Sequence, residues 1–267
     1  MATTTIELDA VPEAPMSLIK VLQAYLLEVK YDTLHGLRTP ALAVPFLVIP
    51  VVVYTLFGVI MAGESGTSEL GPGAANYVFA GMCTFAVLMP GIFSGVGIAL
   101  ERDGKLHKLK RALPMPAGAN LVSKMAMAMI FAAAALTLVV IVALIAGRIT
   151  LSGTQVLIMW IVLVPGSIPI CAIGFFIGAF TSGSASPAFS NLLFLPMMWL
   201  SGMFIPLPEF LRPWVVIWPS FHLQQLALGA AGVSEFSFFP PQMAAGVLVG
   251  FTVLFGGIAI HRLARVG

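Results

Sequence analysis

Residues 125–147, MAMAMIFAAAALTLVVIVALIAG, run without one charged side chain between Lys124 and Arg148. A helix needs about 20 such residues to cross the hydrocarbon of a bilayer, because each of its turns faces lipid. The stretch is long enough, so it predicts a membrane-spanning helix. It also decides the fold class, since its backbone can satisfy its hydrogen bonds in lipid only as a helix.

The composition of the whole chain agrees with a membrane protein. Of its 267 residues, 59% are hydrophobic and 9% are charged, and the mean hydropathy is +1.02. Soluble domains carry about 25% charged residues, and disordered chains need low hydrophobicity, so both classes are excluded. The net charge of +2 is too small to indicate a nucleic-acid partner.

Other uncharged stretches complete the predicted bundle. The long run after Arg148 is broken in two by the small polar residues of Thr181–Pro187. With that break, the chain is predicted to be an all-α integral membrane protein with six spans. These are residues 41–63, 76–100, 125–147, 155–180, 187–206 and 242–261.

Three segments lie outside these spans. Residues 1–16 form a polar tail without the basic start of a secretory signal. Residues 17–39 repeat apolar side chains at three- and four-residue steps, which predicts an amphipathic helix on the cytoplasmic membrane surface. Residues 207–235 contain Trp214, Trp218 and His222 and are too polar for a lipid-facing span, so we expect an extracellular re-entrant segment that acts as a gate or a lid.

The basic residues predict the orientation. All but two of the 13 Lys and Arg residues fall in the N-terminal helix, the loop 101–124 or the C-terminus, and the exceptions are Arg148 and Arg212. Short cytoplasmic loops carry the excess of basic residues. Both termini and the loop 101–124 are therefore predicted to be cytoplasmic.

The span interiors lack the groups that membrane enzymes and ion-coupled carriers use. They contain no Asp, Glu, Lys, Arg or His, although proton relays and hydrolysis at membrane depth require such groups. The only Gly-Lys pair, Gly104-Lys105, has no phosphate-loop context, so ATP would have to be bound by another chain. Cys83 and Cys171 lie in apolar stretches and predict buried thiols, with no metal or cofactor implied.

Two glycine pairs and several prolines mark the helices. Gly91 and Gly95 form a small-xxx-small pair, as do Gly174 and Gly178, and such pairs allow helices to approach closely. Proline interrupts the predicted helices at positions 90, 165, 169 and 196. The apolar interior with Met and Phe suits a bulky hydrophobic cargo or tight packing equally well.

The loop after the second span has a distinctive order of residues. A charged pair, Glu101-Arg102, is followed by Gly104, then by Leu106 and Leu109, and prolines 114 and 116 end the run before Lys124. This order predicts a short amphipathic helix at the membrane face, able to press apolar residues into a partner's groove. A basic loop with no further role explains the composition as well.

The loop and a second region together resemble the ABC-2 type permeases. The second region is Asn191–Pro206, with the later residues Leu211, Trp214, Pro219 and His222. The resemblance covers nearly the whole chain and implies the six-span fold of type V exporters in a bacterial cytoplasmic membrane. It further implies a half-transporter that pairs with a second copy or a homologous permease, each docking a separate ATPase subunit.

The resemblance also implies roles for individual residues. Those that would couple the chain to the ATPase are Glu101, Arg102, Gly104, Leu106, Leu109 and Pro114. Cargo would move beside the first, second and fifth spans, past candidates chosen by position, namely Phe46, Tyr54, Phe194, Met198 and Met203. The stretch 105–111 is more basic than the family pattern, which fits either an acidic partner groove or anionic lipid.

Two functions therefore follow from the sequence. The first is the permease subunit of an ATP-driven exporter for a hydrophobic or amphipathic compound. The second is a membrane scaffold or sensor that docks a cytoplasmic partner without moving cargo. A neighbouring gene for an ATPase would favour the first.

Overall fold

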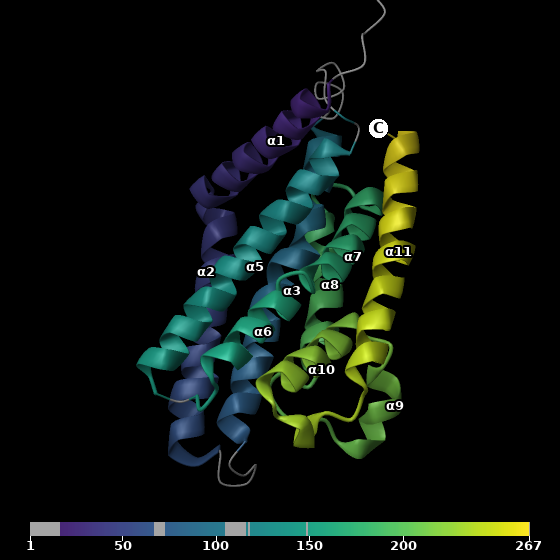
Figure 1. The fold of residues 1–267 in the computed structure, drawn as a ribbon. Helices are drawn as coiled ribbons and strands as arrows, with labels where there is room; N and C mark the ends of the chain where they lie inside the picture. Colours follow the sequence, from purple (N-terminus) through teal and green to yellow (C-terminus); the bar gives the residue numbers. More distant parts are fainter. Residues whose placement is uncertain (1–16, 67–72, 105–115, 117, 148, 267) are drawn as a thin grey trace, which may run out of the picture.

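A computed structural model gives the fold of residues 17–66, 73–104, 116, 118–147 and 149–266 (Figure 1). These described residues are helical and contain no strand, as predicted. The long helices run side by side in one bundle, and α1 crosses one end of it (Figure 1). The elements are α1 Leu18–Arg38, α2 Pro40–Tyr54, η1 Thr55–Gly66, α3 Ala74–Asp103, α5 Ala119–Ile145, α6 Gly153–Leu163, α7 Ser167–Phe180, α8 Ser186–Trp199, η2 Glu209–Leu211, α9 Arg212–Val215, α10 Pro219–Ala231, η3 Ser234–Phe236 and α11 Pro241–Val266.

Five helical segments of the described chain are long and apolar enough to cross a membrane. They are Pro40–Met61, Ala74–Asp103, Ala119–Ile145, Gly153–Phe180 and Pro241–Arg265, which correspond to five of the six predicted spans. The fourth is interrupted between α6 and α7 around Pro165, because a proline removes a backbone donor and bends a helix. The surface helix predicted at 17–39 is α1, whose N-terminus is capped by the Ser17 side chain.

The predicted fifth span, residues 187–206, is a shorter helix. α8 has 14 residues, which at about 1.5 Å per residue covers roughly 21 Å, less than the hydrocarbon thickness of about 30 Å. Pro196 lies inside the helix, and the chain turns after it at Gly202, whose φ of +70° favours glycine. The number of crossings stays a prediction on this point.

The predicted re-entrant segment 207–235 contains three short helices and α10. α10 is almost wholly buried and packs against α3, α6 and α11. The segment lies at the end of the bundle opposite α1 (Figure 1). α10 is enclosed by these helices rather than facing outward. Insertion of the segment into a membrane stays a prediction.

α3 is the central helix of the bundle. It packs against α2, α5, α7, α8 and α10, and nearly all of its apolar residues are buried. Its closest neighbour is α7, because the two glycine pairs pack against each other: a Cβ added at Gly95 would lie 1.7 Å from the carbonyl oxygen of Gly174. The free thiols Cys83 and Cys171 are buried in these same two helices, as predicted.

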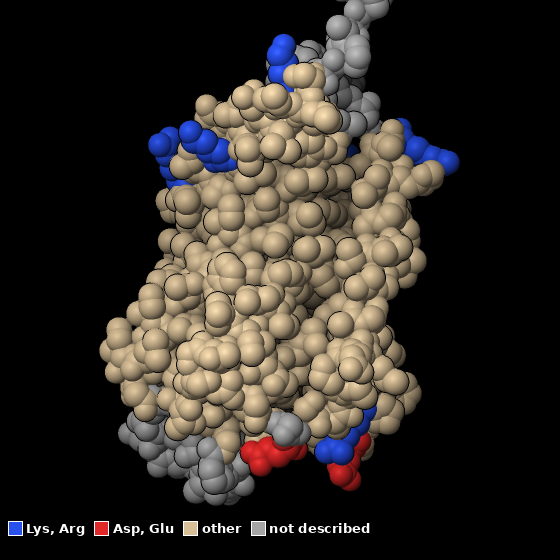
Figure 2. Space-filling model, in the orientation of Figure 1, with Lys and Arg blue, Asp and Glu red and all other residues tan. Residues whose placement is uncertain are grey.

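Charge divides the bundle into two ends. Figure 2 shows Lys and Arg side chains at the end where α1 and the C-terminal part of α11 lie, and acidic side chains together with a basic one at the other. We call these the basic end and the opposite end. The basic end carries Lys20, Lys30, Arg38, Arg262 and Arg265, and the opposite end carries Glu209, Arg212 and Glu235.

Candidate functional site

Three charged side chains meet where α1, α3 and α5 come together at the basic end. Lys124 Nζ of α5 lies 2.9 Å from Asp32 Oδ1 of α1 and 2.7 Å from Glu101 Oε1 of α3. The side chains are nearly buried, with exposed fractions of 7% for Lys124, 12% for Asp32 and 13% for Glu101. A buried ammonium is stabilised only when it is paired in this way. We call Asp32, Glu101 and Lys124 the charged junction.

Two neutral side chains of α5 complete the charged junction. Ser123 Oγ donates to Asp32 Oδ2 at 2.6 Å, and Asn120 Nδ2 donates to Glu101 Oε2 at 2.9 Å. Residues three and four apart share one face of a helix, so Asn120, Ser123 and Lys124 point the same way. The first turns of α5 therefore bind α1 and α3 together.

The next two residues of α3, Arg102 and Asp103, bind the end of α7 and the turn that follows it. Arg102 Nη1 donates to the carbonyl oxygens of Gly178 and Ala179 at 3.1 and 2.8 Å, and its Nη2 donates to that of Thr181. These carbonyl oxygens belong to the last turn of α7 and its C-cap. Carbonyl groups at the end of a helix have no backbone N–H partner within the helix. Asp103 Oδ2 accepts from the backbone N–H of Gly183 at 2.6 Å, in the turn to α8. We call Arg102 and Asp103 the α7 clamp.

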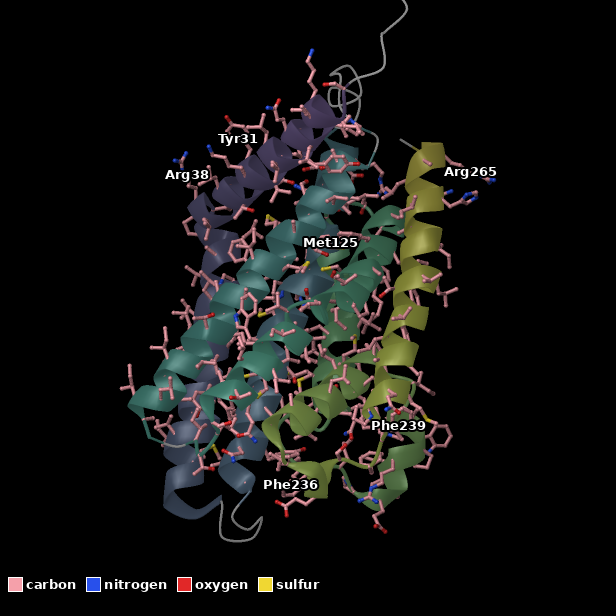
Figure 3. All side chains as sticks on the ribbon, in the orientation of Figure 1. Tyr31, Arg38, Met125, Phe236, Phe239 and Arg265 are labelled. Atoms are coloured by element: carbon pink, nitrogen blue, oxygen red, sulfur yellow. The ribbon has the colours of Figure 1, made fainter. Side chains whose placement is uncertain are left out.

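A cavity of about 470 Å³ lies beneath α1, among α1, α2, α3 and α5. Pockets for small molecules have this size and a mostly apolar lining with a few polar groups. Here the charged junction forms the polar part, together with Glu28 and His35, and the apolar part includes Phe46, Phe93, Phe131, Leu42, Pro90 and Met127. Figure 3 shows Tyr31, another lining residue, on α1 at the basic end.

A continuous row of aromatic rings leads from this cavity toward the opposite end. Neighbouring ring centroids are 5.2 to 6.3 Å apart, within the range of favourable aromatic contacts. We call it the aromatic row, and its members in order are Phe131, Phe46, Phe93, Phe194, Phe85, Phe204 and Trp199. It passes mainly between α2, α3 and α8, which are the first, second and fifth predicted spans.

The predicted pathway residues divide into two groups. Phe46 and Phe194 both belong to the aromatic row, joined through Phe93. Tyr54 and Met203 are buried in the core at 1% and 0% exposed, and Met198 is half-buried against that core. Phe194 links the two groups, because it lies in the same buried cluster as Tyr54 and Met203, and Met198 packs against that cluster. The role of all five in transport stays a prediction.

The predicted coupling residues are partly described. Glu101 and Arg102 make the contacts above, and Gly104 ends α3 with its N–H bonded to the Leu100 carbonyl. Leu106, Leu109 and Pro114 lie outside the described residues, as does the tail 1–16. The sequence pattern therefore pointed to Glu101 and Arg102 as coupling residues without indicating what they would contact.

Sequence reasoning missed Asp32, Ser123 and Phe93. In the sequence, Asp32 is one charged residue of the surface helix and Lys124 follows the basic loop, and neither position indicates a buried partner. One signal was available: Asn120, Ser123 and Lys124 form a polar i, i+3, i+4 face at the start of an otherwise apolar helix, and such a face needs a polar partner. Nothing in the sequence identified α1 as that partner.

The family model of the ABC-2 type transporter matches residues 24–229. The chain belongs to this family. A search of curated proteins found no match. The matched region of the permease contains the charged junction, the α7 clamp, the cavity and the whole aromatic row. Membership makes the chain a multi-pass membrane protein and a permease subunit of an ABC transporter, a family whose members generally work with an ABC ATPase subunit.

Proposed function

We propose that the permease exports a hydrophobic or amphipathic compound, driven by ATP that a separate subunit hydrolyses. The basic end faces the cytoplasm of a bacterial cell in this proposal, because basic residues gather on the cytoplasmic side of membrane proteins. Two copies, or one copy and a homologous permease, form the transporter. Each docks one ATPase subunit at the loop that follows α3.

One observation carries this proposal. Three consecutive residues at the loop end of α3 each contact a different neighbour: Glu101 pairs with α5, Arg102 binds the end of α7, and Asp103 binds the turn to α8. Through Lys124, Glu101 is also joined to α1. A push on the loop after α3 would therefore move α1 and α5, which line the cavity, together with the end of α7.

The proposed cargo path begins in the cavity beneath α1 and follows the aromatic row. Aromatic rings present large, flat apolar surfaces that suit hydrophobic compounds without fixing one shape. Both features lie beside α2, α3 and α8. Exposed apolar side chains of α2 and α8, such as Val52, Leu192 and Trp199, then face lipid or the second permease subunit.

Coupling is tested with Glu101→Gln and Leu106→Asp in the permease co-expressed with its cognate ATPase. In vesicles we expect ATP hydrolysis and amphiphile efflux to become uncoupled, while the amount of membrane-inserted permease is unchanged. Glu209→Gln is the matched control, because Glu209 is an exposed carboxylate at the opposite end. Normal efflux from both the Glu101→Gln and the Leu106→Asp variants would refute the coupling role.

Orientation is tested separately by labelling introduced cysteines from outside the cell. Thr67→Cys and Glu235→Cys should react with a membrane-impermeant maleimide, and His107→Cys should not. The natural thiols are buried and give a low background. The reverse labelling pattern would overturn the orientation without affecting the family assignment.

A further inference from the structure

A second cavity, of about 190 Å³, lies at the opposite end and has no part in the proposed coupling. It is a partly open cavity lined by α3, α9, α10, η3 and the chain after α8. Its polar lining includes Tyr77, Ser201, Arg212, Gln224, Gln225 and Glu235. Figure 3 shows Phe236, a further lining residue, at the end of the bundle away from α1.

Gln224 is the unusual residue of this cavity. It is 1% exposed, yet neither its amide nitrogen nor its amide oxygen has a hydrogen-bond partner within the described residues. Its neighbour Gln225 is equally buried but accepts hydrogen bonds from Ser237 Oγ and the Phe238 N–H, at 2.9 and 3.2 Å. Buried amides are almost always satisfied, so Gln224 presents one donor group and one acceptor group to a molecule in the cavity.

Two opposite charges border the same cavity. The Arg212 guanidinium lies 4.9 Å from the centre of the Phe238 ring and 3.4 Å from Glu209 Oε1, and its side chain is 44% exposed. Glu235 approaches the start of α3 so closely that a Cβ added at Gly73 would lie 2.3 Å from its Oε1. Guanidinium binds phosphate oxygens in a planar fork, and carboxylate accepts hydrogen bonds from an ammonium. The lining therefore matches a ligand that carries both charges.

We propose that this cavity binds a head group with a phosphate and a primary ammonium, supplied by a zwitterionic membrane phospholipid. The phosphate would face Arg212 and the Gln224 amide N–H, and the ammonium would donate to the Gln224 oxygen and Glu235. A quaternary ammonium has no N–H to donate and would leave the Gln224 oxygen unsatisfied. Trp214, in the same segment 207–235, is 69% exposed and is a side chain typical of the membrane interface. The neighbouring Phe210 is 73% exposed and adds apolar surface there.

The test measures lipid binding to the purified full-length permease in detergent. Phosphatidylethanolamine, phosphatidylcholine and phosphatidylglycerol are compared by native mass spectrometry and by the shift in Tm on lipid addition. We expect phosphatidylethanolamine to bind at least tenfold more tightly than the other two. These readouts need neither ATPase nor transport, so they stand or fall independently of the proposed export function.

Gln224→Leu is the decisive variant, and Gln242→Leu, on the exposed start of α11, is its control. Leucine removes an unsatisfied buried amide, so the Tm without lipid should stay level or rise, while binding of phosphatidylethanolamine should fall at least tenfold. Equal binding of all three lipids, or unchanged binding in Gln224→Leu, would overturn the proposal. Free phosphoethanolamine that binds as tightly as the lipid would overturn the lipid as the source.

Discussion

The two ends of the bundle are held together by different chemistry. At the basic end, charged groups on long helices are buried and paired, as Lys124 is with Asp32 and Glu101. At the opposite end, the buried contacts are neutral: Ser220 Oγ donates to the Met197 carbonyl at 2.9 Å, and Tyr77 donates to that of Gly202. The charged residues there, Glu209 and Arg212, are exposed.

The difference matters because the two kinds of contact differ in what it costs to break them. Removing one partner of a buried ion pair costs about 3–5 kcal/mol, whereas a neutral hydrogen bond contributes about 0.5–1.5 kcal/mol. The contacts at the basic end are therefore expected to be harder to break than those at the opposite end.

The largest effect is expected for Lys124→Met at the charged junction. Methionine replaces the unbranched apolar part of the lysine side chain but leaves the carboxylates of Asp32 and Glu101 buried without the ammonium between them. We expect a loss of about 3–5 kcal/mol in the free energy of unfolding, measured by denaturation in detergent. Lys20→Met, at an exposed position of α1, is the control. A loss below about 1 kcal/mol would contradict the contrast between the ends.

The second effect is expected for Arg102→Ala in the α7 clamp. It removes a charged donor from three carbonyl oxygens at the end of α7, and hydrogen bonds to charged groups contribute about 1.5–3 kcal/mol. We expect the free energy of unfolding to fall by an amount in that range, together with faster hydrogen exchange at the end of α7. Arg102→Lys should recover only part of it, because an ammonium lacks the planar fork of a guanidinium. Full recovery would mean that charge alone matters at this position.

A smaller effect is expected for Ser220→Ala at the opposite end. The Ser220 hydroxyl is buried beside Ser201 and bonds to the Met197 carbonyl, so its loss should cost about 0.5–1.5 kcal/mol. The same denaturation experiment measures it. A cost equal to that of Lys124→Met would show that the opposite end is held as firmly as the basic end.

The smallest effect is expected for Glu209→Gln. Glu209 pairs with Arg212 at 3.4 Å, but its side chain is 87% exposed, and exposed ion pairs of this kind contribute less than about 1 kcal/mol. Comparison with Lys124→Met sets an exposed single ion pair against a buried ammonium with two carboxylate partners. A stability loss that vanishes in high salt would identify the Glu209 pair as purely electrostatic.

Parts of the fold and site were predictable because they depend on local pattern. Apolar stretches between charges located the long helices, and the periodicity of residues 17–39 located α1. The order of Glu101, Arg102 and Gly104 is likewise a local pattern of the chain, and the coupling role assigned to it stays a prediction. The short α8 was not foreseen, since composition reports where a stretch is apolar but not where Pro196 and Gly202 end its helix.

Contacts between distant segments were beyond the sequence, for a physical reason. Asp32 and Lys124 are separated by 92 positions, and whether each faces water or the other depends on how α1 crosses the bundle. The same holds for the glycine pairs, which pack α3 against α7, and for Gln224, whose burial follows from the enclosure of α10.

By itself, the sequence determined that this chain is a membrane protein, that its helices have polar ends and apolar interiors, and that its basic residues lie in a few segments. Those properties follow from the free energy of transferring side chains from water to lipid, to which each residue contributes almost independently. Only the tertiary structure decided that three of those charges are buried together, that aromatic rings form a continuous row, and that one amide faces a cavity unpaired. Such properties arise from the packing of helices against one another, which no single segment specifies.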